Sequence, residues 1–231
     1  MFNEKDLSNK EVYINSLDSE TAIGKPTYCD YALLKGKEQL LQAEVDGYIG
    51  QAFTDRPGYY KGNLKEVFAL PLSDNFQRAI FIATLNALLR KQGAIQKSIH
   101  CRGESPASCA LLLSEYIKTF FKPTKVVLIG YQPRFAETLA ESFLLRINDL
   151  DNDNIGKKVK DSGINEVCIE SSSTSKENVD WGDLIVVTGS AIVNNTFSYF
   201  FPSNKPVLFF GTSIVGPAQL LGLNHFCPLS S

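Results

Sequence analysis

Small polar residues follow directly after an apolar run in the segment 183–197, DLIVVTGSAIVNNTF, and their types suit ligand binding. Gly189 permits a sharp turn out of a strand, while Ser190 and Asn194 are both competent helix caps. Capping explains one or two such residues but not the whole group. We therefore expect a binding site here, formed by Thr188, Gly189, Ser190, Asn194, Asn195 and Thr196.

The same chemistry recurs after other apolar runs of the second half. Gly130 ends the run KVVLIG and precedes a helix start, whose free backbone N–H groups suit an anion. Arg134 would add a bidentate positive charge. Asp149 and Asp151 follow another run, where dinucleotide-binding folds place a carboxylate that holds a ribose hydroxyl. The expected ligand-binding set therefore also includes Gly130, Tyr131, Gln132, Arg134, Asp149, Asp151, Gly211, Thr212 and Ser213.

These residues meet only if the chain forms a parallel sheet. From Ile99 onward, short apolar runs alternate with helical spacers, which is typical of βαβ units in a doubly wound, Rossmann-like, mostly parallel sheet. From about Tyr28 to Pro71, strand-type runs and turn signals predict an antiparallel meander. The helix predicted over FQRAIFIATLNALLRKQ is apolar on nearly every face and should be buried. The predicted fold is α/β, with an N-terminal α+β domain (1–98) and a Rossmann-like ligand-binding domain (99–231).

The ligand site should lie where the strand order of this sheet reverses. In open α/β sheets, ligands bind beyond the carboxyl ends of the strands at that point. If the order runs outward from KVVLIG, the reversal lies between this strand and DLIVVTG, and their exit loops bring Gly130 and Thr188 to one crevice. Helix capping and loop solvation remain the alternative explanation of the polar residues.

The dinucleotide signal itself is weak. No G-x-G-x-x-G occurs, because the loop GYQPRF has a single glycine, and its Tyr, Gln and Pro leave less room for a pyrophosphate to approach the backbone. NAD or NADP is therefore disfavoured. The serine-rich stretch 171–178, SSSTSKEN, has the composition of an exposed loop.

Residues with metal-binding side chains form two short clusters. His100, Cys101 and Cys109 lie in IHCRGESPASCA, while His225 and Cys227 alternate in NHFCP. Their spacing does not match the paired ligands of zinc sites, and a buried cysteine commonly packs as a small hydrophobe. They are weak metal candidates, and the carboxylates and hydroxyls of the crevice offer a hard cation an alternative site.

The composition argues against several classes of function. A formal net charge of -2 with scattered Lys and Arg gives no electrostatic case for binding nucleic acid or an anionic membrane. Five irregularly spaced cysteines without a CxxC fit a reducing compartment, and the polar N-terminal segment lacks the apolar core of a signal peptide. We expect a cytoplasmic protein with a small-molecule partner, and a homo-oligomer is left open.

Three segments, VVLIGYQPRF, WGDLIVVTGSAIVNNTF and VLFFGTSIVGPAQLLGLNHF, resemble the C-terminal domain of the "putative heavy-metal chelation" family, whose biochemical role is unknown. The segment through DNFQRAIFIATLNALL looks like the accompanying domain, which has an enolase N-terminal-like α+β fold. The resemblance implies two domains with a ligand cleft between them, and its name implies metal. The positions that match the family pattern are Gly130, Asp183, Thr188, Gly189, Asn194, Thr196, Gly211 and Ser213.

Two functions from different classes follow from these observations. The first is a binding protein or ancillary enzyme whose interdomain cleft takes a small anionic ligand that is nucleotide-, flavin- or pterin-like. The alternative is a protein that handles a transition metal or metal chelate, with a divalent metal as its cofactor. With two histidines in the chain, catalysis would rest on Asp149 or Asp151 as base, and the residues leave open whether the protein is an enzyme.

Overall fold

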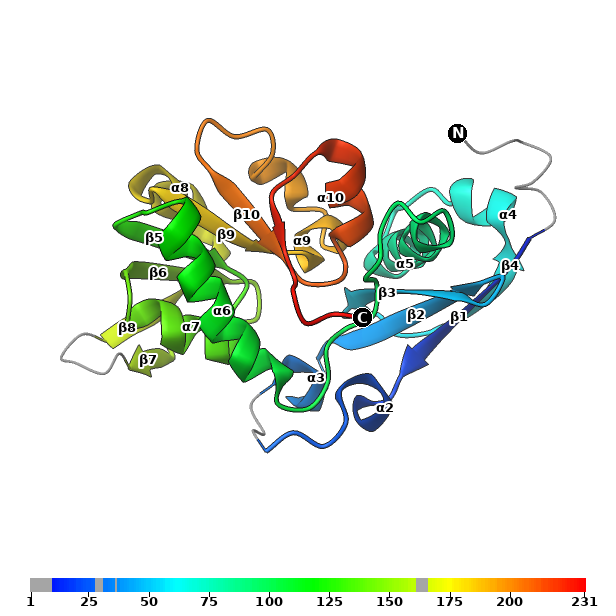
Figure 1. The fold of residues 1–231 in the computed structure, drawn as a ribbon, viewed down its shortest axis with the longest axis horizontal. Helices are drawn as coiled ribbons and strands as arrows, with labels where there is room; N and C mark the ends of the chain where they lie inside the picture. Colours follow the sequence, from blue (N-terminus) through cyan, green and yellow to red (C-terminus); the bar gives the residue numbers. More distant parts are fainter. Residues whose placement is uncertain (1–9, 28–30, 36, 161–165) are drawn as a thin grey trace.

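A computed structural model describes residues 10–27, 31–35, 37–160 and 166–231 and contains two β-sheets, one from each half of the chain (Figure 1). The first sheet has four strands in the order β3-β2-β1-β4, with antiparallel pairs. Its strands are β1 (Glu11–Leu17), β2 (Gln39–Val45), β3 (Tyr48–Thr54) and β4 (Tyr59–Asn63).

This first sheet is antiparallel as predicted, but it is not a simple meander. Asp46 and Gly47, with φ of 51° and 80°, form a two-residue turn between β2 and β3. The strand at residues 11–17 was not predicted, and it lies between β2 and β4. The run at Ala32–Lys35, which we expected to be extended, forms the short helix α3 instead. The predicted start of the meander near Tyr28 lies outside the described residues.

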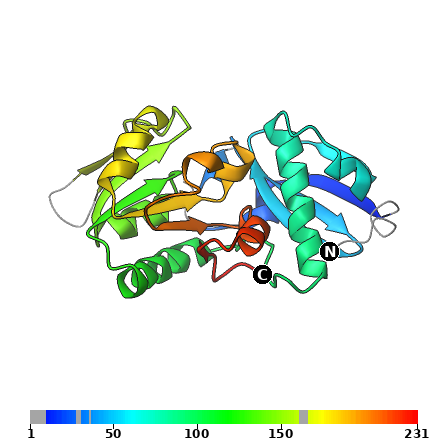
Figure 2. The ribbon, with the colours of Figure 1, turned by 90° about the horizontal axis from the view of Figure 1, so that it is seen from above.

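Helices cover both faces of the first sheet (Figures 1 and 2). The long helix α5 (Asn75–Lys91) packs on one face and is buried on most sides, as its apolar pattern predicts. The helix backbone lies very near the sheet at Gly50 of β3, where an added Cβ would lie 2.3 Å from the backbone oxygen of Ala83. The other short helices of this half are α2 (Ser19–Ile23), which packs on the opposite face with α3, and α4 (Leu64–Phe68).

The second sheet has seven strands in the order β11-β10-β9-β5-β6-β8-β7. Every neighbouring pair is parallel except β7 with β8. Because the order runs outward from β5 in both directions, it reverses between β5 and β9, as predicted. The strands are β5 (Lys125–Ile129), β6 (Leu144–Asp149), β7 (Lys158–Lys160), β8 (Glu166–Ser171), β9 (Leu184–Thr188), β10 (Val207–Phe210) and β11 (His225–Phe226).

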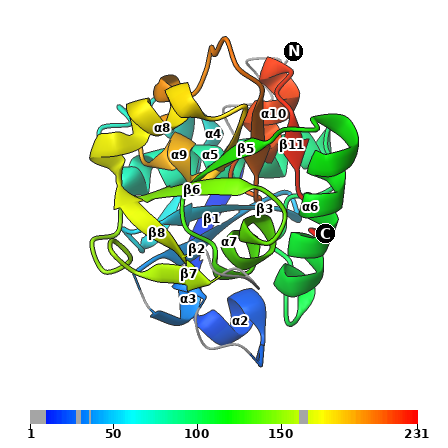
Figure 3. The same cartoon turned by 90° about the vertical axis from the view of Figure 1, so that its left-hand side faces the viewer.

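Alternating apolar residues divide this sheet into two covered faces (Figures 2 and 3). Val126 and Leu128 of β5 pack against α6 (Ser105–Phe120) and α7 (Pro133–Ala140). Val127 of the same strand packs on the opposite face. The elements on that side are η1 (Ser172–Thr174), α8 (Ser175–Trp181), α9 (Ser190–Val193), η2 (Phe197–Tyr199) and α10 (Val215–Leu221). The serine-rich stretch 171–178 is therefore mostly helical, which corrects the expected loop.

The buried amide of Asn86 joins the two halves of the chain. Its Nδ2 donates to the carbonyl oxygens of Gln51 on β3, at 3.0 Å, and Thr212 after β10, at 3.1 Å. Its Oδ1 accepts from the backbone N–H of Gly216 on α10 at 2.9 Å. The fold class is as predicted, an α+β unit followed by a mostly parallel sheet, while the division at residues 98 and 99 stays a prediction. Within the described residues, no helix has the length and apolar character needed to cross a membrane.

Candidate functional site

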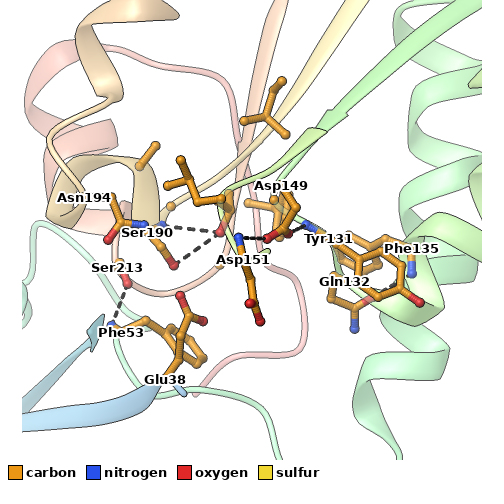
Figure 4. Close-up of a pocket in the computed structure, with 18 of the residues that line it drawn as sticks. Glu38, Phe53, Tyr131, Gln132, Phe135, Asp149, Asp151, Ser190, Asn194 and Ser213 are labelled. Carbon is orange, nitrogen blue, oxygen red and sulfur yellow. Dashed lines mark hydrogen bonds between the residues drawn. The ribbon is translucent and has the colours of Figure 1, made fainter. Parts of the chain in front are cut away.

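A cavity of about 1300 Å³ opens between the two halves of the chain (Figure 4). The second half contributes the carboxyl ends of β5, β6, β9 and β10, and the first half contributes residues such as Glu38 and Phe53. Aromatic side chains, among them Phe135 and Phe200, form part of its wall. A concave site with apolar walls and a few converging polar groups is typical of small-molecule binding.

Most of the predicted ligand-binding residues line this cavity. The exit loops of β5 and β9 touch, because a Cβ added to Gly130 would lie 2.5 Å from the Cγ2 of Thr188. Ser213 of the β10 loop accepts a hydrogen bond from the backbone N–H of Phe53 at 2.9 Å, which links the two halves at the cavity wall. The predicted residues that line the cavity are Gly130, Tyr131, Gln132, Asp149, Asp151, Thr188, Gly189, Ser190, Asn194, Thr196, Gly211, Thr212 and Ser213. That they bind a ligand stays a prediction.

Two predicted residues are not among those that line the cavity. Arg134 is nearly buried on α7, and its Nη1 pairs with the Oε2 of Glu137, one turn along the helix, at 2.9 Å. Asn195 is exposed and has a left-handed φ of 59°, directly after Asn194, the C-cap of α9. Asparagine tolerates this conformation, so the turn explains its presence without a ligand. The expectation that both residues face the crevice is corrected.

The amino end of α7 was predicted to bind an anion, but backbone N–H groups there already donate to side chains of the protein. The backbone N–H of Tyr131 donates to the Oδ2 of Asp149 at 2.5 Å, and the N–H of Phe135 donates to the Oε1 of Gln132 at 2.6 Å (Figure 4). Pro133 has no N–H to offer. An anion that approached the N–H of Tyr131 or of Phe135 would have to displace these acceptors, so the helix start gives little support to an anionic ligand.

A carboxyl group that the sequence analysis did not select, that of Glu38, points into the cavity (Figure 4). Protein surrounds it closely, although its cavity side keeps some solvent contact. Burial, as the largest effect, and the nearby carboxylates of Asp149, Asp55 and Asp151, in that order, together raise the pKa of Glu38 to about 7. Such a shift at a cavity wall is typical of functional carboxyls. In the sequence, KGKEQLL shows an ordinary charged residue before a strand, so no local signal was available.

The carboxylates around Glu38 are engaged by other groups. Asp55 accepts from the Nδ2 of Asn75 at 2.7 Å, and Asp151 pairs with the Nζ of Lys37 at 2.6 Å. Asp149 accepts from two backbone N–H groups, and burial, as the largest effect, still raises the pKa of its carboxyl. Among the described residues, by contrast, Glu38 has no hydrogen bond or ion pair. The cavity therefore contains one deeply placed carboxyl that is available to a ligand.

Three of the candidate metal ligands are cysteines that line the cavity, namely Cys101, Cys109 and Cys227. Burial, as the largest effect, raises the pKa of Cys101 and of Cys109 to about 12, and Cys227 lies close enough to contribute to this shift in both. Burial also raises the pKa of Cys227. The thiols therefore lie near one another but hold their protons, whereas metal ions bind the thiolate form.

The two histidines do not complete a metal site with these thiols. His100 lines the cavity, but burial lowers its pKa to about 4, and its buried Nδ1 has no hydrogen-bond partner among the described residues. His225 is not a lining residue, and its Nε2 contacts the carbonyl oxygen of Gly211 at 2.9 Å. In the part of the chain that the structure describes, no three His, Cys, Asp or Glu side chains are grouped to hold a metal ion. Cys29 lies outside that part.

Comparisons with known proteins confirm the family resemblance. Residues 114–217 match the model of the DUF364 family, described as "Putative heavy-metal chelation". A DUF364 structure of unknown function from Pyrococcus horikoshii is 13% identical, with a TM-score of 0.56 over 90% of this chain and 75% of that chain. Another from Desulfitobacterium hafniense is 14% identical, with a TM-score of 0.53 over 80% of this chain and 72% of that chain. A comparison with curated proteins found no match. At these identities the two structures show a shared fold.

Proposed function

We propose that this chain, which matches the DUF364 family over residues 114–217, binds a small organic molecule in the cavity between its two halves. The cavity itself carries this proposal. Its volume of about 1300 Å³ is above the roughly 300–1,000 Å³ of ordinary ligand pockets, so a ring system with a substituent would fit. The hydrogen bonds of Asn86 and Ser213 across the junction support a cavity that exists before the ligand arrives.

Within this class, a nitrogen heterocycle of the nucleotide, flavin or pterin type suits the cavity best. Tyr131 and Phe135 offer aromatic surface, and Glu38 offers carboxyl oxygens that accept hydrogen bonds from ring and exocyclic N–H groups. A phosphate on such a ligand would find donors in Ser173 and Lys176, which also line the cavity, rather than in Arg134. The proposed ligand types are those predicted from the sequence, but the residues proposed to contact their phosphate are different.

A thermal-shift screen of nucleotides, flavins, pterins and S-adenosylmethionine tests the proposal. A ligand that binds the folded state raises the melting temperature, because saturation adds RT ln(1 + [L]/Kd) to its stability. The same screen on Ser190→Phe, which fills the cavity, should show no shift, while Ser108→Phe on the exposed side of α6 should respond like the wild type. Circular dichroism would confirm that both variants fold. A hit that binds Ser190→Phe unchanged, or no hit at millimolar concentration, would contradict the proposal.

Handling of a metal or metal chelate is the second candidate, and two observations favour it. The family description names heavy-metal chelation, and Cys101, Cys109 and Cys227 line the same cavity. The residues do not fit a preformed site, because the thiols are protonated and the described side chains form no group of three ligands. Elemental analysis of protein purified without a His-tag tests this candidate. Stoichiometric metal that is lost when the three cysteines are replaced by serine would favour it over the first proposal.

A further inference from the structure

Glu38 combines three properties that together point to a ligand. Its carboxyl group faces the cavity, protein surrounds its other sides, and no described residue bonds to it. A charged group in such a place is unfavourable unless it is paired, because desolvation penalises the ionised form. A structural carboxylate would have a partner in the protein, as Asp149 and Asp55 do. The partner of Glu38 is therefore expected to come from outside the chain.

The charged groups around Glu38 determine the sign of that partner. Asp55 after β3, and Asp149 and Asp151 at the end of β6, all act on Glu38 with negative charge. Lys37, the neighbour of Glu38 in the chain, turns instead to Asp151 and Asp153, with both N–O distances at 2.6 Å. The surroundings of the Glu38 carboxyl are therefore negative, and they favour a cation over an anion.

We propose that Glu38 recognises a positively charged nitrogen group of the ligand, an amine or an amidinium-type edge, by accepting its N–H hydrogen bonds. This inference rests on the proposed function and names the ligand chemistry at one point of the same cavity. When the cation binds, the proton of the neutral Glu38 carboxyl passes to solvent, and the carboxylate that remains pairs with the nitrogen group. Protonated heterocycles and amidines carry such an edge, whereas carboxylate-bearing ligands do not.

The effect of pH follows from the same pairing. Burial and the neighbouring carboxylates raise the pKa of Glu38 to about 7, so the paired form becomes available as pH rises through neutrality. For a cation that keeps its charge, affinity should be about tenfold greater at about pH 8 than at about pH 6, since the ionised fraction changes by that factor. A neutral ligand of the same shape should show little of this dependence.

Calorimetric titration with three probes of one shape tests the inference, namely benzamidine (a cation), benzamide (neutral) and benzoate (an anion). We expect benzamidine to bind most tightly, with the tenfold pH dependence, and benzoate least. Glu38→Gln keeps the size of the side chain and removes its charge, so it should weaken benzamidine binding about tenfold or more and abolish the pH dependence. Glu44→Gln, which alters an exposed glutamate of β2, should leave both unchanged.

Two results would overturn the inference. One is benzoate or benzamide binding as tightly as benzamidine, and the other is undiminished benzamidine binding to Glu38→Gln. Absence of benzamidine binding at millimolar concentration would also overturn it. If, in any of these cases, ligands found in the thermal-shift screen stabilise the wild type but not Ser190→Phe, the proposed cavity function stands and only the role of Glu38 is refuted. If those ligands stabilise Ser190→Phe as much as the wild type, both the cavity function and the role of Glu38 are refuted.

Discussion

The side chain of Asn86 forms hydrogen bonds with both halves of the chain next to the cavity. Its removal should measurably destabilise the protein. The side chain is fully buried and donates to two carbonyl oxygens, those of Gln51 and Thr212, while it accepts from the N–H of Gly216. Asn86→Ala removes all three hydrogen bonds at once. It leaves two backbone acceptors and one backbone donor without partners at a buried junction.

The size of the effect can be worked out from these contacts. A buried polar group left without a hydrogen bond costs about 1–3 kcal/mol. A water molecule that enters the vacated space would restore part of this, because it can bond to several of the groups. We therefore expect a loss of about 3–5 kcal/mol in the free energy of unfolding, at the high end for one substitution. For a chain of this length, that loss lowers the melting temperature by about 10 °C.

Urea and thermal unfolding of Asn86→Ala against the wild type measure this loss. Asn224→Ala is the matched control. Among the described residues, the side chain of Asn224 makes one long hydrogen bond, of 3.4 Å to the carbonyl oxygen of Val207, so its loss should change stability by less than about 0.5 kcal/mol. A free energy of unfolding for Asn86→Ala within about 1 kcal/mol of the wild type would refute the reasoning that this amide holds the junction together.

Three further predictions concern other parts of the molecule. Because the pKa of Glu38 is about 7 when folded and near the ordinary 4.5 when unfolded, the folded state keeps a proton that the unfolded state has lost. Wild-type stability should therefore fall, by at most about 3 kcal/mol, as pH rises between these values, and thermal melts of Glu38→Gln should lack this fall. Gly50→Ala should destabilise the protein by about 3 kcal/mol or more, because its Cβ would meet the α5 backbone at 2.3 Å; wild-type melting would refute this. Arg134→Ala should change the affinity for any ligand found in the screen by less than about twofold relative to the wild type. A tenfold loss of affinity would show that Arg134 contributes to ligand binding after all.

Local patterns in the sequence were sufficient for the mostly parallel character of the second sheet and for the place of the cavity, but not for the edge strand β7. The apolar runs ending in Gly130 and Thr188 predicted parallel strands, and the reversal of strand order puts their exit loops in contact. The position of β1 within the first sheet could not be predicted in this way, because strand order depends on pairing between distant segments. The helix at Ala32–Lys35 was missed because four residues are too few to show a period.

The side chains of the site were less predictable than its location. Glu38 owes its unusual environment first to burial and then to Asp149, Asp55 and Asp151. Asp149 and Asp151 are more than a hundred positions away in the sequence and come close only in the fold. Arg134 was misplaced although a signal was present, since Glu137 stands three positions later on the same helix and forms the ion pair that holds it. Pairings at helical spacing therefore need to be considered before a charge is assigned to a ligand.

Carbon-13 NMR titration of glutamate side-chain carboxyls, with and without benzamidine, tests most directly the claim that the cavity offers an available carboxyl to a ligand. The account predicts one resonance with a midpoint near the pKa of about 7 expected for Glu38, absent from Glu38→Gln and shifted to lower pH when benzamidine is added. A Glu38 resonance that titrates near the ordinary value of 4.5 and does not respond to benzamidine would contradict it.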